Sequence, residues 1–120
     1  MTDKASFTKY EHQVLPGFRH RLSHAESSED VKQSFSFTAQ ELLDKVLAGR
    51  LPVSQADVAL TPDAAPFFVL GERLSADAEL ASICAGSDLP NVLGRLAEAA
   101  VHRYRHVERH PEKTNSKIRG

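Results

Sequence analysis

The chain has 120 residues, of which 41% are hydrophobic and 26% are charged, and its formal net charge is −1. This composition fits one globular domain with a single core and excludes a chain that is disordered throughout. No run approaches the roughly 18 apolar residues that span a bilayer, and the near-neutral charge excludes a general attraction to nucleic acid or anionic membranes.

The N-terminus and the cysteine content indicate a compartment. The first residues lack the long apolar segment of a secretory signal peptide. Cys84 is the single cysteine, so no intrachain disulfide can form, which agrees with a reducing environment. We therefore expect a cytoplasmic protein with no membrane-embedded part.

Residues 5–25 have the apolar spacing of a helix. One face would consist of Phe7, Val14, Phe18, Leu22 and Ala25. A capping-box pattern at Thr8 places the helix start there. Pro16 and Gly17 interrupt the segment while the apolar stripe continues, so we expect a kinked helix or two short helices that share one buried face.

Residues 28–48 have the clearest helical pattern. Ser27 or Ser28 can cap the first turn, and acidic residues follow where the helix dipole favours them. A broad apolar face consists of Val31, Phe35, Ala39, Leu42, Leu43, Val46 and Leu47. Gly49 lies where a left-handed residue commonly ends a helix.

Residues 50–75 contain two short apolar runs and three prolines, which argue against a long helix. We expect a loop-rich segment with a small hairpin that pairs Val58–Leu60 with Phe67–Leu70. Periodicity alone leaves a helical alternative open for each run.

Two further helices complete the expected elements. Ser75 can cap a short helix over residues 76–85, which Gly86 would end. Ser87 or Asp88 can cap the last helix, which would continue to Arg109, shortly before Pro111.

The predicted fold class is mainly α, a single compact bundle of four to five helices with one small β-hairpin within residues 56–71. Residues 1–110 would form the domain and residues 111–120 a polar tail. The core would consist of Phe7, Val14, Phe18, Leu22, Val31, Phe35, Leu42, Leu43, Val46, Leu93, Leu96, Ala100 and Val107.

Three histidines of the last helix, His102, His106 and His110, are four residues apart. On a helical wheel at about 100° per residue they lie opposite the leucines, among arginines. One interpretation is an ordinary solvated face. A second is a metal or haem site, in which His20 and His24 of the first helix would converge with His102 and His106. The neighbouring arginine charges oppose a bound cation, so we expect no metal and no other cofactor.

A basic surface for a partner is the third interpretation. Residues 95–120 contain seven basic and three acidic residues. The sequence lacks a nucleophile elbow, a phosphate-binding loop and a zinc-protease motif, so we expect no enzymatic activity. Cys84 lies near a helix C-terminus, which favours a buried apolar role over a reactive thiolate.

The function hypothesis is a small cytoplasmic, non-catalytic binding or regulatory protein that presents a partly basic helical surface to another protein. The partner-binding residues would be Arg95, His102, Arg103, Arg105, His106 and Arg109. A protein-interaction module also predicts an exposed apolar patch around Phe67 and Phe68. Nucleic-acid binding through the basic C-terminal helix is the alternative.

Overall fold

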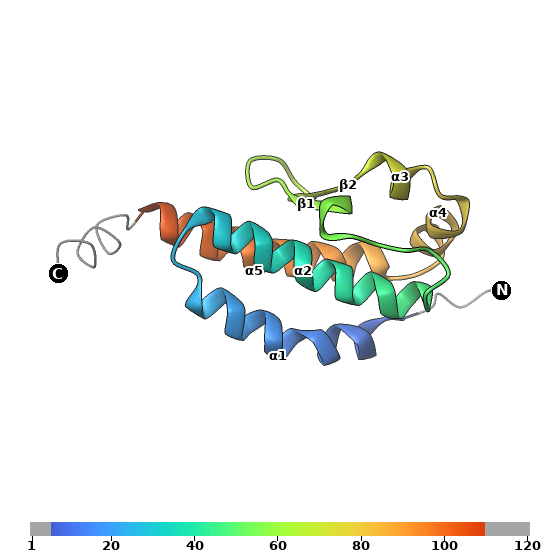
Figure 1. Cartoon of the computed structure of the whole chain (residues 1–120), viewed down its shortest axis with the longest axis horizontal. Coiled ribbons are helices and arrows are strands. Elements are labelled where there is room, and N and C mark those ends of the chain that lie inside the picture. The colour runs from blue at the N-terminus through green and yellow to red at the C-terminus, as the bar shows by residue number, and fades with distance from the viewer. Residues whose placement is uncertain (1–5, 110–120) are drawn as a thin grey trace.

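The protein is mainly helical, and its computed structural model describes residues 6–109 (Figure 1). In chain order the elements are α1 (Thr8–His24), α2 (Ser28–Leu47), the 3-10 helix η1 (Gln55–Asp57), β1 (Val58–Leu60), β2 (Phe68–Leu70), α3 (Glu72–Ser75), α4 (Ala78–Ala85) and α5 (Leu89–Arg109). The predicted class, a helical bundle with one small hairpin, is confirmed. The predicted tail, residues 111–120, lies outside the described residues.

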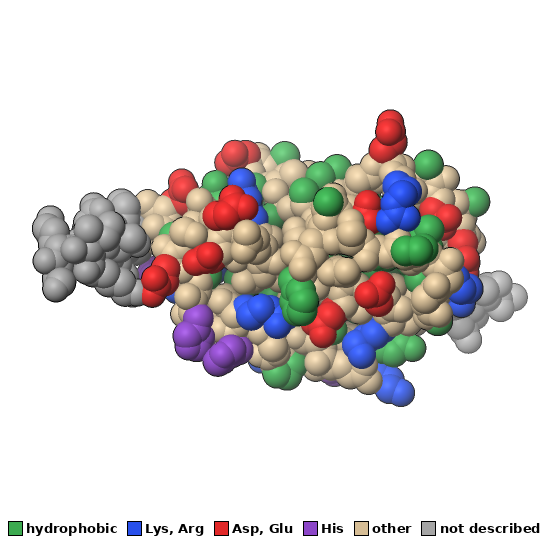
Figure 2. All heavy atoms as spheres, in the orientation of Figure 1, with side chains coloured by type: hydrophobic (Ala, Val, Ile, Leu, Met, Phe, Trp, Pro, Cys, Tyr) green, Lys and Arg blue, Asp and Glu red, His purple; other side chains and the backbone are tan. Residues whose placement is uncertain are grey.

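The three long helices form the body of the molecule. α2 packs against both α1 and α5, and α1 also contacts α5 (Figure 1). The hairpin lies against α2 and α5 on the side away from α1. Acidic and basic side chains are mixed over the face that Figure 2 shows. No helix within residues 6–109 is both long enough and apolar enough to cross a membrane.

α1 is one continuous helix, so the alternative of two short helices is wrong. Pro16 lies on its exposed side, where water can reach the carbonyl that the proline leaves without a backbone partner. The predicted start at Thr8 is confirmed, but the capping box is not. Phe7 is the N-cap and makes no side-chain cap bond, and Glu11, which would have reached back to the cap, is turned toward α5.

α2 begins and ends as its sequence predicts. The Ser27 hydroxyl accepts a hydrogen bond from the Asp30 amide at 3.1 Å, which satisfies one free amide of the first turn. At the other end Ala48 and Gly49 both adopt left-handed backbone angles, with φ of 53° and 79°. The chain thereby leaves the helix and turns toward the hairpin.

The hairpin is confirmed and is antiparallel. Its register pairs Val58 with Leu70 and Leu60 with Phe68. Phe67, expected in the second strand, instead belongs to the turn and has a φ of 77°. Such an angle is strained for a bulky residue. Hydrogen bonds on both sides hold it there, because its carbonyl accepts from the Thr61 amide at 2.7 Å and its amide donates to the Ala64 carbonyl at 2.8 Å.

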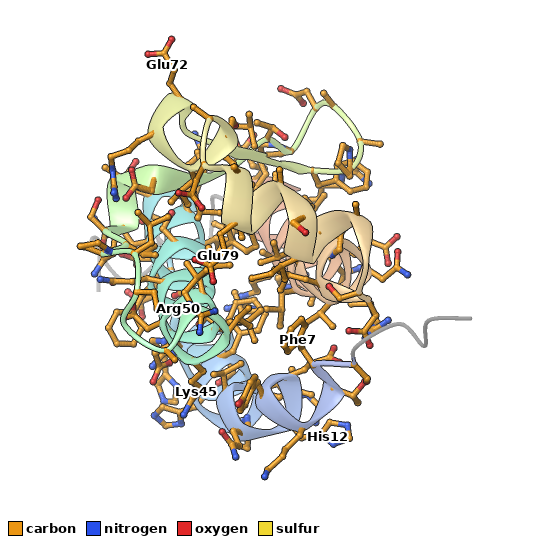
Figure 3. All side chains as sticks on the ribbon, turned by 90° about the vertical axis from the view of Figure 1, so that its right-hand side faces the viewer. Phe7, His12, Lys45, Arg50, Glu72 and Glu79 are labelled. Atoms are coloured by element: carbon orange, nitrogen blue, oxygen red, sulfur yellow. The ribbon has the colours of Figure 1, made fainter. Side chains whose placement is uncertain are left out.

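The helix expected to begin after Ser75 begins later. Ser75 ends the short helix α3, which the sequence pattern did not predict. Asp77 is the cap of α4, and its carboxylate accepts from the Leu80 amide at 2.8 Å. Arg50, just after α2, points to Glu79 of α4, and the two charged groups are 2.6 Å apart (Figure 3).

Most of the predicted core is buried, including Val14, Phe18 and Phe35. Phe7 and Val107 were predicted in the core but are only partly buried, since each lies near an end of its helix. Within the described residues, the buried hydrophobic residues absent from the core prediction are Ala25, Ala39, Leu47, Val53, Val58, Leu60, Leu74, Leu80, Leu89, Val92, Ala97 and Val101. Several of these lie in or under the hairpin segment, which adds a second apolar contact surface to α5.

Asp88 ties the start of α1 to the segment before α5. Its carboxylate accepts hydrogen bonds from the Phe7 amide at 2.8 Å and from the hydroxyls of Ser6 and Thr8 at 3.0 and 3.3 Å. Burial alone would raise the pKa of Asp88, but these bonds outweigh it and hold the pKa below its usual 3.8. The ionised form is therefore the one that stabilises the fold.

We predict that Asp88→Asn lowers the unfolding free energy at pH 7 by about 1 kcal/mol, because an amide replaces a charged acceptor. Because the pKa of Asp88 is lower in the folded state, the ionised carboxylate stabilises the fold at pH values above the unfolded-state pKa of 3.8. This stabilisation is lost as the pH falls through the folded-state pKa. The difference between wild type and variant should therefore shrink below about pH 4. Urea unfolding at pH 7 and at pH 3.5 measures it, and a constant difference would contradict the assignment.

Candidate functional site

One stripe of α5 lines an open groove beside the hairpin. Within this stripe Arg95, Glu98, His102 and Arg105 are three or four residues apart, as expected for one face of a helix. The groove, called the α5 groove below, has a volume of about 540 Å³ and is lined by Phe67, Arg95, Glu98, Ala99, Val101, His102 and Arg105. The apolar residues Leu93, Leu96 and Ala100 turn the opposite face of the helix into the core, so the charged stripe faces water.

Arg95 forms a two-point ion pair with Glu11 of α1. Its Nε lies 3.0 Å from Oε2 and its Nη2 lies 2.8 Å from Oε1. The Glu11 side chain is 8% exposed, whereas that of Arg95 is 52% exposed. The hydrogen bond to Glu11 raises the pKa of Arg95 above its usual value. Arg95 thus borders the groove while Glu11 compensates its charge.

Arg103 contacts the end of α1. Its Nη2 donates to the carbonyls of Ala25 at 2.8 Å and of Ser23 at 3.4 Å, where α1 ends. Carbonyls at a helix C-terminus lack partners within the helix, and a cation near them is favourable. The side chain therefore joins α5 to the end of α1, and it does not line the groove.

Arg105 is exposed and lies at the hairpin side of the groove. Its guanidinium carbon is 5.8 Å from the centre of the Phe67 ring, within the range of a cation–π contact. Arg105 also borders a second, smaller depression of about 260 Å³, which Pro62, Asp63, Tyr104 and Glu108 complete. Arg105 is thus the predicted partner-binding residue that lines both depressions.

The other predicted partner-binding residues are divided. His102 is exposed and lines the α5 groove, whereas His106 is half-buried. Of Arg109 the structure describes only the backbone, as the last residue of α5. The structure therefore brings together Arg95, His102 and Arg105, and places Arg103 elsewhere.

The predicted apolar patch differs from expectation. Phe67 and Phe68 are both half-buried, because the hairpin packs them against the core. Within residues 6–109 the exposed large hydrophobic side chains are those of Val69, at 51%, and Phe37 of α2, at 37%. The contribution of Phe67 to the groove is one partly accessible ring, not an extended apolar surface.

Three of the four histidines of the metal hypothesis line two separate grooves, and His106 lines neither. His20 and His24 line a hollow with residues of α2, while His102 lines the α5 groove. Within residues 6–109 no three histidine, cysteine, aspartate or glutamate side chains lie together as a metal site. The structure therefore does not bring His20, His24, His102 and His106 together.

Cys84 is partly buried in α4. Burial raises the pKa of its thiol above 9.0, which keeps the thiol protonated near neutral pH. This environment agrees with the predicted packing role, although the side chain is less buried than expected.

The α5 groove thus combines two guanidinium groups, an imidazole, an aromatic ring and two small apolar side chains with one carboxylate, that of Glu98. Guanidinium groups pair with carboxylates and phosphates through fixed hydrogen-bond geometry. These are binding groups for an anionic ligand. No protein-family model, curated protein or solved structure matched the chain.

Proposed function

We propose that this is a small, non-catalytic binding or regulatory protein of the cytoplasm, whose α5 groove binds an acidic segment of another protein. The observation that carries the proposal is the placement of Arg105. Its exposed guanidinium lies over the Phe67 ring at the edge of a groove that Arg95 and His102 also line. A carboxylate in the groove would meet cations on both sides and an aromatic ring beside them.

The proposed surface is smaller than the six residues named from the sequence. Arg95, His102 and Arg105 remain in it, because each lines the groove. Arg103 is assigned to the packing of α1 on α5 instead. Arg105 is the residue whose charge is most available to a partner, since Glu11 already compensates Arg95.

A protein partner is favoured over nucleic acid by the acidic residues within the same surface. Glu98 lines the groove, and Asp63 and Glu108 border the adjoining depression. A nucleic-acid backbone presents phosphates in a continuous row, so its binding surfaces are usually basic over a larger area. A short peptide can place its carboxylates beside the cations and avoid the acidic positions.

We predict that Arg105→Ala weakens binding of an acidic peptide about three- to fivefold, the effect of one exposed charge pair. The probe is an acetylated, amidated hexaglutamate peptide, titrated into isotopically labelled full-length protein while amide chemical shifts are followed. Wild-type shifts should be largest for residues that line the α5 groove. Arg19→Ala is the matched control, because Arg19 is also an exposed arginine but lies on α1.

Three results would overturn the proposal. The peptide shifts could fall outside the groove, or Arg105→Ala could bind the peptide as tightly as the control does. The third is tighter binding of a 12-base-pair DNA duplex at the same residues, with an affinity that falls steeply as salt rises. That result would favour the nucleic-acid alternative.

A further inference from the structure

His20 and His24 form an exposed pair of imidazoles at the C-terminal end of α1. They are one helical turn apart, and their ring centres are separated by 4.4 Å. Figure 2 shows histidine side chains gathered on this part of the surface. Two imidazoles at this spacing on a helix can bind one metal ion together.

The hydrogen bond of one ring nitrogen of His24 favours metal coordination by the other ring nitrogen. Its Nδ1 lies 2.9 Å from the carbonyl oxygen of His20. A carbonyl oxygen only accepts, so Nδ1 is the donor in this contact, and the Ser23 hydroxyl oxygen lies 3.2 Å from the same nitrogen. In the neutral ring this tautomer leaves the lone pair of Nε2 for a metal ion. Histidines that bind metals commonly use this arrangement, because the second hydrogen bond sets both the tautomer and the direction of the ring.

The surroundings leave room for the other ligands of a metal ion. The pair borders an open groove of about 390 Å³ whose far side is formed by residues of α2, including Asp30 and Gln33. Asp30 contributes a negative charge to the groove. Within the described chain no third histidine, cysteine or carboxylate is close enough to complete the site. The remaining coordination positions would hold water or an incoming ligand.

The neighbouring Arg21 lines the same groove, and its guanidinium contacts groups of α2. The Arg21 guanidinium carbon lies 4.4 Å from the centre of the Phe37 ring, and its Nη2 donates to the Thr38 hydroxyl at 2.9 Å. The same nitrogen is 3.6 Å from a carboxylate oxygen of Glu41. The charge of Arg21 is therefore partly balanced by α2, which reduces its repulsion of a cation at the histidines.

We propose that His20 and His24 form a two-ligand binding site for a divalent late-transition-metal ion such as Ni²⁺ or Cu²⁺. Imidazole suits these ions, and the affinity of nitrogen sites rises from manganese toward copper. With two protein ligands the ion is held at the surface and stays exchangeable. The proposal is independent of the α5 groove, since the two grooves share no residue.

His102 and His106 have the same spacing on α5 but a different environment. His106 is half-buried, and His102 lines the α5 groove together with Arg95 and Arg105. Two arginines beside a metal ion oppose its charge. This pair therefore serves as an internal comparison for the pair on α1.

The test is calorimetric titration of Ni²⁺ into untagged full-length protein and four variants. His20→Gln and His24→Gln each remove one imidazole and keep a polar side chain on an exposed helix position. Each should weaken Ni²⁺ binding by at least about tenfold, since even loss of a supporting hydrogen bond to a ligand costs that much. His12→Gln is the matched control, because His12 is an exposed histidine of α1 at the opposite end of the helix (Figure 3). The variants His12→Gln and His102→Gln should bind Ni²⁺ with the same affinity as the wild type.

Circular dichroism of every variant confirms that the helices are retained. The proposal is overturned if either variant of the pair binds Ni²⁺ as tightly as the wild type. It is equally overturned if His12→Gln or His102→Gln weakens binding as much as the variants of the pair. Absence of Ni²⁺ binding to the wild type would also reject it. None of these results bears on the acidic-peptide proposal.

Discussion

Replacing Phe35 by alanine is expected to lower the unfolding free energy by about 3–5 kcal/mol, the usual cost of removing a buried aromatic ring. Phe35 is fully buried in α2, the helix that contacts α1, α5 and the hairpin. Its ring therefore fills space that several elements share, and no single element can close over the cavity. A domain of this size has a total stability of about 5–15 kcal/mol, so the variant would lose a large share of it.

Urea unfolding followed by circular dichroism measures this loss. Phe37→Ala is the matched control, because it makes the same change in the same helix at a position that is 37% exposed. Its expected cost is about 1 kcal/mol or less, mainly from the contact between its ring and the Arg21 guanidinium. Equal losses in the two variants would show that α2 does not have the orientation described here.

Arg95→Ala is expected to lower the unfolding free energy by about 2–3 kcal/mol. The change leaves the buried Glu11 carboxylate without the guanidinium that accounts for both of its short contacts. Removing one partner of a buried ion pair typically costs about 3–5 kcal/mol. The expected loss is smaller because the Arg95 side chain is half exposed, so water reaches the site and screens the remaining charge.

The double variant Glu11→Gln with Arg95→Ala separates this charge effect from lost packing. A neutral amide costs less to bury than an unpaired carboxylate, so the double variant should regain part of the lost stability. The comparison uses urea unfolding of the wild type, both single variants and the double variant. If the double variant is no more stable than Arg95→Ala, the buried charge of Glu11 is not what destabilises that variant.

The role of Arg95 in stability decides which variant can test the binding proposal. A weaker peptide affinity of Arg95→Ala would combine lost contacts in the α5 groove with changes in the packing of α1 on α5. Arg105 is exposed, and its guanidinium contacts the Phe67 ring. Its replacement therefore changes the groove with little expected effect on stability.

Elements set by local patterns were predicted well. α2 has a serine cap, a long apolar face and a glycine after its end, and each of these features acts over a few residues. The hairpin was also found, because prolines exclude a long helix and leave two short apolar runs to pair. The start of α4 was missed because Ser75 and Asp77 are both suitable caps, and only the backbone angles of the folded chain select Asp77.

The candidate site was predicted only in part, because its geometry depends on contacts between distant segments. The wheel of α5 placed Arg95 and His102 on the outward face, and both line the groove in the structure. It carried no information on Glu11, which is 84 residues from Arg95 in the sequence. The partners of Arg103 at the end of α1 likewise depend on the tertiary structure.

The sequence by itself determined the helical class, the hairpin and the outward direction of the basic stripe, because apolar periodicity and capping act within one or two helical turns. Tertiary structure decided which cations remain available to a partner and which histidines lie together. Ion pairs and grooves form where α1, α5 and the hairpin meet, and the packing of these elements is a property of the whole core.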